Sequence, residues 1–213
     1  MARRRKDKLD WSGIPIETII DREFGRNPEL KSGMSAYADM LAEWEESGDG
    51  ERFLERLLDH AGAAYRKAGN ARAELYTFSD GAANFLFDMV RERVVLVWGV
   101  SKTVAPNTRD NAYHAGYPTA GKNLDKGHAW SHAQGGREGG PNYFRQARRL
   151  NQARSSNGKL WRAIESHLAA NAGLSAFIRL IYAKGNVGDR PDEVEYGILS
   201  GSGQFRSVIF PNS

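Results

Sequence analysis

The sequence predicts an α+β fold in which an antiparallel sheet follows a helical N-terminal segment. Two observations predict it. Apolar residues recur at helical spacing in the first third of the chain, and β-branched runs of strand length gather after residue 90. The 213 residues are enough for a substantial core in one large domain or two small ones. The change in composition near residue 90 predicts a helical segment over 1–90, with a regulatory or partner-binding role, and an α+β domain over 91–213.

Three segments have the periodicity of amphipathic helices. The first covers 28–44, follows Pro28 and is stopped near Gly48. The second covers 53–69, and its apolar periodicity ends near Gly69. The third begins behind an N-cap cluster at Ser155 and ends near Gly173.

Strands are predicted mainly in the second half of the chain. Residues 93–98 form a β-branched apolar run, and further candidates are 177–182, 194–199 and 205–210. The segments 73–78 and 85–90 are ambiguous between strand and helix. In the middle of the chain, 101–125 is loop-like, 128–133 is compatible with a short strand, and the glycine-rich 135–141 is a loop.

The composition excludes several classes of protein. The chain has no cysteine, which excludes disulfides, thiolate zinc sites, iron–sulfur clusters and a cysteine nucleophile, so any metal is held by oxygen or imidazole. No apolar run reaches the roughly 20 residues of a membrane span, so we expect no membrane contact. Residues 1–6 are charged with no apolar run behind them. We therefore expect no secretory signal peptide and a cytoplasmic location, or delivery to another cell by a dedicated system.

Charge is unevenly distributed along the chain. The formal net charge is +4, a mild preference for anionic partners. Basic residues dominate between 141 and 170, whereas acidic residues dominate between 39 and 59. The simplest interpretation of each run is a solvated face. The alternatives are that the basic run faces an anionic substrate, and that the acidic run masks it or recruits a partner.

The densest group of reactive side chains begins with Asp125-Lys126-Gly127-His128 and continues with Asn151 and Glu165. Hydrolysis of a phosphodiester needs an activated water, a cation on the non-bridging oxygens and stabilisation of the leaving oxyanion. A histidine can be the base near neutral pH, and a hard cation such as Mg²⁺ accepts carboxylate and amide oxygens. Lysine and arginine can neutralise phosphoryl charge. All of these parts are present.

This series resembles the DNA/RNA non-specific endonuclease family, within the ββα-metal (His-Me finger) nucleases. Asp125-Lys-Gly-His128 is similar to the family's D-[RK]-G-H signature, and 127–136 is similar to the strand and Gly-Gly turn that follow it. Asn142-Tyr-Phe-Arg-Gln146 resembles N-L-x-P-Q, Leu150-Asn151 resembles the metal-binding L-N, and Trp161-Arg-Ala-Ile-Glu165 resembles W-x-x-x-E. The resemblance covers about 93–213 and implies a ββα-metal nuclease core. Lys126 and Arg145 depart from the more usual Arg and Pro.

The resemblance implies a role for each matching residue. His128 is the general base, Asn151 is the direct protein ligand to Mg²⁺ with Mn²⁺ as a substitute, and Glu165 lies beside the metal through a coordinated water. Asp125 orients the motif, and Lys126 contacts phosphate as a point charge. The remaining candidates are expected to bind substrate or to hold the metal-bearing loop: Arg109, Arg145, Gln146, Arg148, Arg149 and Lys159.

Each of these assignments has a structural alternative. Glu165 has helical i, i+3 spacing to Arg162 and can simply pair with it. Trp161 is most simply a core residue. His60, His114 and His167 are expected to be surface or satisfied core residues. His132 alternates with Trp130 and, on a strand, would lie on the face opposite His128.

The residues and the resemblance together predict a Mg²⁺-dependent non-specific endonuclease that acts on DNA, RNA or both, and the resemblance implies that it leaves 5′-phosphate ends. The alternative is a catalytically inactive nucleic-acid-binding or protein-interaction module. A third interpretation is a hydrolase of another phosphodiester. Because a non-specific nuclease endangers its own cytosol, we hypothesise an inhibitor or immunity protein as a partner, or a role as a toxin or defence effector.

Overall fold

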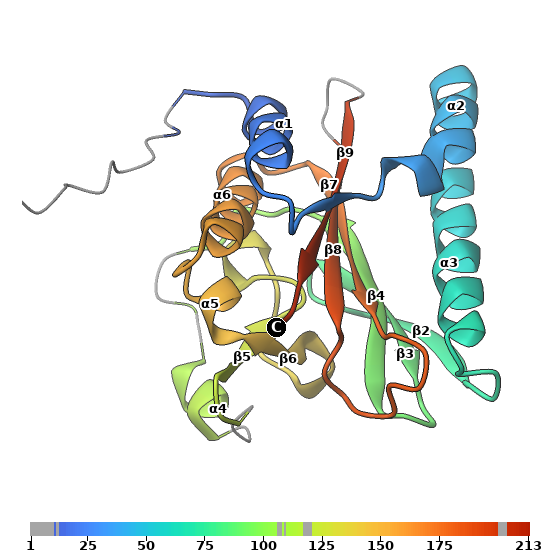
Figure 1. Cartoon of the computed structure of the whole chain (residues 1–213), viewed down its shortest axis with the longest axis vertical. Coiled ribbons are helices and arrows are strands. Elements are labelled where there is room, and N and C mark those ends of the chain that lie inside the picture. Colours follow the sequence, from blue (N-terminus) through green and yellow to red (C-terminus); the bar gives the residue numbers. More distant parts are fainter. Residues whose placement is uncertain (1–10, 12, 106–107, 109, 117–120, 200–203) are drawn as a thin grey trace, which may run out of the picture.

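The computed structural model describes residues 11, 13–105, 108, 110–116, 121–199 and 204–213. A central sheet stands between two layers of helices and carries a small two-stranded ribbon at one side (Figure 1). The predicted α+β class with an antiparallel sheet is confirmed.

The large sheet has seven strands in the order β1-β9-β8-β7-β4-β3-β2, and every neighbouring pair is antiparallel. The strands predicted near 93, 177, 194 and 205 are all present. The two ambiguous segments are also strands, β2 and β3, joined by a tight turn. The bounds are β1 Lys31–Ser32, β2 Leu75–Asp80, β3 Ala83–Asp88, β4 Arg93–Val100, β7 Ser175–Ile181, β8 Glu193–Leu199 and β9 Phe205–Pro211.

Helices cover both faces of this sheet. The helices α2 (Ala38–Ser47) and α3 (Gly50–Lys67) lie on one side, and α1 (Ile16–Arg26), α5 (Arg148–Asn151) and α6 (Ser156–Ala170) lie on the other (Figure 1). A short helix, α4 (Asn111–Gly116), lies in the segment predicted to be loop, beside the ribbon of β5 (Leu124–His128) and β6 (Tyr143–Ala147). Three 3₁₀ turns complete the elements: η1 Met34–Tyr37, η2 His132–Gln134 and η3 Gly140–Asn142. Among the described helices, none has the length and apolar character of a membrane span.

The prediction of one helix over 28–44 is wrong in its first half. Residues 31–32 pair with β9 as an edge strand, and the α-helix begins only at Ala38. At Gly33 a side chain would collide with the carboxylate of Glu195 and the hydroxyl of Ser207, so close packing on the sheet determines the local structure. The helix Ile16–Arg26 was not predicted, although Ile16, Ile19 and Ile20 form its buried stripe.

The first 90 residues are not a separate helical unit in the structure. They contribute β1, β2 and β3 to the same sheet as the C-terminal strands. Asn27, just after α1, also donates a hydrogen bond of 3.2 Å to Ser156 at the start of α6. The segments before and after residue 90 therefore share one sheet, and the end of α1 is hydrogen-bonded to the start of α6.

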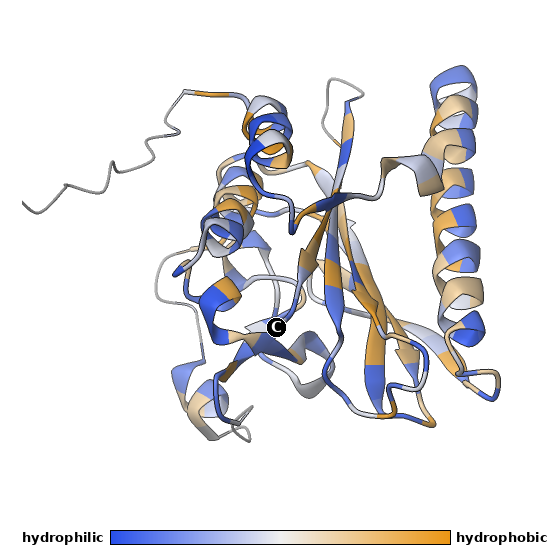
Figure 2. Ribbon diagram, in the orientation of Figure 1, coloured by the Kyte–Doolittle hydropathy of each residue, from blue (hydrophilic) through white to orange (hydrophobic). Residues whose placement is uncertain are grey.

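The core lies on both faces of the sheet. On one face Trp161, 1% exposed, packs edge-on against Tyr196 and Phe210 with ring-centroid distances of 5.0 and 5.4 Å, which confirms its predicted core position. On the other face the buried stripe of α3, which includes Phe53 and Leu57, packs on the strands. Figure 2 shows the corresponding apolar colouring along the central strands. Burial of such side chains is the main favourable contribution to folding.

Glu195 is a completely buried carboxylate within this core. Glu195 on β8 is 0% exposed and accepts hydrogen bonds from Tyr37 at 2.9 Å and from Arg179 at 2.6 Å, as well as from Ser207. Burial, and then the negative charge of Glu195, raise the pKa of Tyr37, so its phenol stays protonated as a donor. A buried charge is tolerated only when its partners satisfy it, and here they come from three separate parts of the chain.

We predict that Glu195→Ala lowers the free energy of unfolding by about 3–5 kcal/mol, because it leaves the guanidinium of Arg179 buried without its carboxylate. As a matched control, Asp21→Ala breaks the exposed pair with Arg206 and should cost less than about 1 kcal/mol. Urea denaturation of both variants measures the difference. Equal losses would show that the buried pair contributes no more than the surface pair.

Candidate active site

The β5–β6 ribbon carries the predicted reactive motif. Residues directly opposite each other on an antiparallel ribbon share a face, and His128 lies opposite Tyr143 while Asp125 lies opposite Gln146. Because side chains alternate along a strand, Lys126 and His128 lie on one face and Asp125 lies on the other. The structure thus separates the motif into two groups, which we call the His128 face and the Asp125 face.

Of the segment 128–133, which the sequence left compatible with a short strand, only His128 lies in a strand. The strand β5 ends at His128, and the chain leaves the ribbon through buried Ala129 and Trp130 into the turn η2. The alternation that would set His132 opposite His128 therefore does not apply. His132 lies instead near Thr108, with 3.3 Å between its Nε2 and the threonine hydroxyl.

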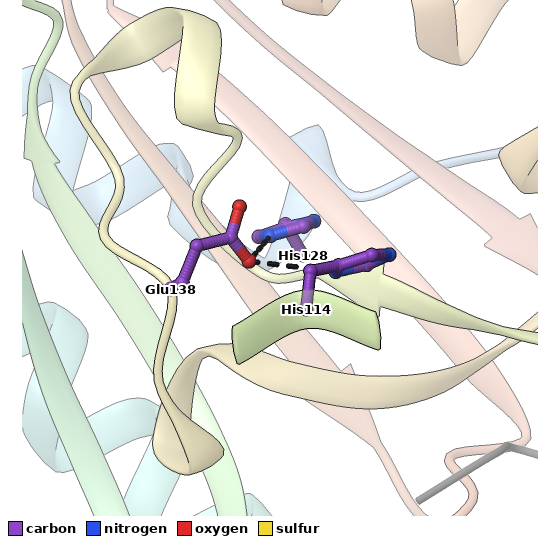
Figure 3. Close-up of side chains that lie close together, drawn as sticks. All are labelled: His114, His128 and Glu138. Atoms are coloured by element: carbon purple, nitrogen blue, oxygen red, sulfur yellow. Dashed lines mark hydrogen bonds and ion pairs between the residues drawn. The ribbon is translucent and has the colours of Figure 1, made fainter. Parts of the chain in front are cut away.

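On the His128 face, two histidines and a glutamate converge (Figure 3). The Nε2 atom of His128 lies 2.9 Å from Oε2 of Glu138, and Nδ1 of His114 lies 3.4 Å from the same oxygen. Tyr143 also donates its hydroxyl hydrogen to that oxygen. The side chains of His128 and Glu138 are only 12% and 5% exposed, so these contacts are largely shielded from water.

The glutamate of this cluster was missed by sequence reasoning, and His114 was expected to be structural. Each of the three side chains comes from a different segment: α4, the end of β5 and the glycine-rich loop. Lys126 donates a hydrogen bond to the backbone oxygen of His114 and so fastens α4 to the ribbon. The signal available in the sequence was an acidic residue in a glycine-rich loop, which is weak without the fold.

The loop that carries Glu138 is held by Asn142. Its side-chain oxygen accepts from the Trp130 amide at 2.7 Å, and its nitrogen donates to the carbonyls of Trp130 and Arg137 at 2.9 and 2.8 Å. Gly136 lies directly against the Trp130 carbonyl, where a Cβ atom would collide with the backbone. The buried amide and this close approach fix the loop predicted over 135–141.

The Asp125 face holds a second polar group. Asp125 accepts hydrogen bonds from Arg148 at 3.0 Å, Asn151 at 3.1 Å and Gln152 at 2.8 Å. Burial raises the pKa of Asp125, but the hydrogen bonds from Asn151, Arg148 and Gln152 lower it further and leave it below its ordinary value. Because Asn151 donates its amide nitrogen here, its side-chain oxygen is the atom that can accept from another group.

Glu165 on α6 is linked to this group through Arg162. The Arg162 Nε atom lies 3.6 Å from the Glu165 carboxylate, and Nη2 donates to the Asn151 carbonyl at 3.0 Å. The structure therefore contains the helical pairing that the sequence offered as an alternative. Burial raises the pKa of Glu165, whereas Arg162 and a hydrogen bond from Trp161 oppose this rise.

The other predicted substrate residues are scattered around the ribbon. Arg145 pairs with Asp189 at 2.8 Å, Arg149 donates to the Ser213 carbonyl at 2.9 Å, and Lys159 is exposed on α6. Arg109 lies outside the described residues. The expectation that Gln146 contacts substrate is corrected by its burial: it is 1% exposed and packs against Gly127, beneath the ribbon.

The described residues also line hollows away from the His128 cluster, and two of them bear on function. A basic cavity of about 420 Å³ is lined by Arg148, Arg149 and Arg154 together with Asn123, Ala147 and Ser213. An apolar groove of about 830 Å³ lies between α3 and the sheet, with Phe53, Trp98 and Phe177 among its lining residues. Among the described lining residues of the groove, Lys102 is the one with a charge. The groove is the larger hollow but has little that could perform acid–base chemistry.

The fold and these sites define a mixed α+β protein with a half-buried cluster of titratable groups. Searches with this chain found no matching family model and no matching curated protein. Among solved structures, the chain is similar to "Structure of Sda1 nuclease with bound zinc ion", at 12% identity and a TM-score of 0.43, over 66% of this chain and 84% of that one. A likeness this distant carries no argument about what this chain does.

We predict that Asp125→Asn lowers the free energy of unfolding at pH 7 by about 1 kcal/mol, because the amide loses its charge-assisted bond with Arg148. The folded-state pKa of Asp125 lies below its usual 3.8, so its contribution is complete above that pH and is lost as pH falls through the folded pKa. The difference between the two proteins should therefore shrink from pH 7 to pH 3 in urea titrations. Asp189→Asn, at the exposed pair with Arg145, is the control. A difference that stays constant with pH would assign the loss to packing.

Proposed function

We propose that the protein is a divalent-metal-dependent nuclease of the ββα-metal type, which hydrolyses phosphodiester bonds of DNA, RNA or both with His128 as the general base. The observation that carries the proposal is the contact of 2.9 Å between His128 Nε2 and the buried Glu138 carboxylate. It supplies what a base needs, namely a fixed orientation and a defined tautomer. The sequence resemblance and the order of ribbon, α5 and α6 agree with this proposal.

The proton on the His128 ring follows from its partner. An ionised carboxylate can only accept hydrogen bonds, so Nε2 carries the proton of the neutral imidazole. The lone pair is then on Nδ1, which is the atom that would take a proton from the attacking water. The negative charge of Glu138 would stabilise the imidazolium that forms.

The Asp125 face offers oxygen donors of the kind that Mg²⁺ or Mn²⁺ accepts. Asn151 would supply its amide oxygen, and Glu165 would act through a bound water. The raised pKa of Glu165 fits this role. Burial destabilises its negative charge more than Arg162 stabilises it, so a bound cation would be favourable there. When bound, the ion would neutralise charge on the phosphoryl oxygens and activate water. Asp125 would hold Asn151 in place through the hydrogen bond of 3.1 Å.

The substrate we propose for this site is a nucleic-acid backbone, bound without sequence preference. The basic cavity beside Arg148, Arg149 and Arg154 lies next to the Asp125 face, and phosphate contacts made there would carry no sequence information. In-line attack on phosphorus would leave 5′-phosphate and 3′-hydroxyl ends. Lys126 and Lys159 would add to the positive field.

We predict that His128→Ala loses about 10²–10⁴-fold in turnover, the usual cost of removing a general base. DNA binding should persist because it depends on cations rather than on the imidazole. The wild-type rate should fall as pH drops and the imidazole gains a proton, and the variant should lack this acidic limb. Plasmid cleavage across pH and fluorescence anisotropy measure the two properties.

The matched control for this variant is His132→Ala, four residues away and outside the cluster. It should retain the acidic limb even if its rate is lower. If His132→Ala were inactive while His128→Ala kept near-normal turnover, the base would be His132 instead.

We also predict that a chelator abolishes cleavage and that Mg²⁺ restores it. Asn151→Ala should raise the Mg²⁺ concentration needed for half-maximal rate by about 10-fold or more, and Glu165→Ala should raise it less because its contact passes through water. Metal titrations of initial rates measure both. Full activity in excess chelator would sink the metal-dependent mechanism, and an unchanged requirement in Asn151→Ala would place the ion elsewhere.

A second candidate function, a protein-interaction module without activity, is favoured by the apolar groove under α3. The same plasmid assay separates the two, because a module of this kind leaves DNA and RNA intact with every metal.

For the nuclease, we keep the hypothesis that an inhibitor or immunity protein is a partner and that the protein is delivered as a toxin. The acidic run 39–59 spans α2 and the first part of α3, and both helices lie on the side of the sheet opposite α5 and α6 (Figure 1), so this run does not cover the basic residues there.

A further inference from the structure

The His128 face has a donor set different from that of the Asp125 face. Two imidazole nitrogens and one carboxylate oxygen, from His114, His128 and Glu138, all lie within 4.8 Å of one another. Nitrogen donors of this kind suit zinc and similar transition metals, whereas Mg²⁺ prefers oxygen. The chemistry of the cluster therefore points to a different ion from the one expected near Asn151.

The two separations that involve Glu138 are close to those of a tetrahedral ion. With bonds of about 2.0–2.1 Å, two ligand atoms of tetrahedral zinc lie roughly 3.3 Å apart. The two separations from Glu138 Oε2, 2.9 Å to His128 Nε2 and 3.4 Å to His114 Nδ1, lie on either side of that value. Figure 3 shows both rings directed at the same carboxylate oxygen.

A supporting shell surrounds the three candidate ligands. Tyr143 donates to the ligand oxygen of Glu138, and Lys126 holds α4, and with it His114, against the ribbon. Such contacts orient ligands and contribute to metal affinity. The small exposed fraction of Glu138, 5%, means that a bound cation would offset a carboxylate charge that water reaches poorly.

We infer that His114, His128 and Glu138 form a binding site for Zn²⁺, and that zinc in this site blocks His128 as a base. The second part of this inference rests on the proposed function, and it follows from which ring nitrogen of His128 carries the proton. Zinc takes the lone pair of Nε2, so the single proton of the neutral imidazole must sit on Nδ1. Without zinc, the contact with Glu138 keeps that proton on Nε2. In the proposed function Nδ1 takes the proton of the attacking water, so the tautomer that zinc imposes is the one that cannot act as this base.

Direct binding of Zn²⁺ to the full chain tests the site without any assay of activity. Isothermal titration with ZnCl₂ should show one site in the wild type, with affinity at least about 10-fold weaker in His114→Ala and in Glu138→Ala. His132→Ala and His167→Ala, which remove imidazoles outside the cluster, should bind as the wild type does. Circular dichroism of each variant identifies any loss of fold. Absence of binding by the wild type, or equal affinity in folded cluster variants, would overturn the site.

Nitrogen-15 NMR of the histidine rings tests the proton inventory. In the metal-free protein the His128 proton should be on Nε2, and one equivalent of Zn²⁺ should move it to Nδ1. A His128 ring spectrum that zinc leaves unchanged would contradict the inference even if zinc bound elsewhere. His167 should be unaffected and serves as the internal control.

The effect of zinc on activity is measured as the ratio of the cleavage rate with zinc to the rate without zinc, for each protein separately. In the presence of saturating Mg²⁺, zinc should inhibit wild-type cleavage, and His114→Ala should need at least about 10-fold more zinc for half inhibition relative to its own uninhibited rate. If the wild type cleaves DNA but binds no zinc, this inference fails and the proposed function stands. If it binds zinc at the cluster but cleaves no nucleic acid with any metal, the proposed function fails and the zinc site stands.

Discussion

The side-chain amide of Asn142 closes the loop behind β5 onto the backbone of Trp130, and the geometry of the candidate site depends on that closure. An amide buried at 2% exposure must satisfy both its oxygen and its nitrogen, and the observed position of the loop does so. That position buries Trp130, leaves no space for a side chain at Gly136 and sets Glu138 against His128. The arrangement of the His128 cluster therefore depends on hydrogen bonds made by residues outside the cluster.

The β5–β6 ribbon also determines which charged side chains of the motif lie on each of its two faces. Because pleating sends neighbouring side chains to opposite faces, the motif of four residues supplies two environments rather than one. The Asp125 face is rich in cations and oxygen acceptors, and the hydrogen bonds there hold the pKa of Asp125 below its usual range. The His128 face is rich in imidazole and holds a shielded carboxylate.

Much of the fold could be predicted from the sequence, because its strands and two of its helices have strong periodicity. The strands near 93, 177, 194 and 205 and the N-cap at Ser155 follow from local chemistry. The first half of the predicted helix over 28–44 did not, because pairing with β9 and the close approach at Gly33 outweigh local preference. The site shows the same limit. His128 and Asn151 lie in recognisable motifs, whereas Glu138 and His114 reach the cluster only through the loop closure and the docking of α4.

The same carboxylate would give the His128 ring two incompatible arrangements. As a hydrogen-bond acceptor, Glu138 favours the proton on Nε2, which is the tautomer that the proposed general base requires. As a metal ligand beside Nε2, it would help to hold an ion that reverses that assignment. Glu138 takes part in both arrangements, so the choice between them depends on His114, whose Nδ1 lies 3.4 Å from the shared oxygen and supplies the third donor. Lys126 holds the short helix α4 by a hydrogen bond to the His114 carbonyl, so the proposed metal site depends on the position of α4.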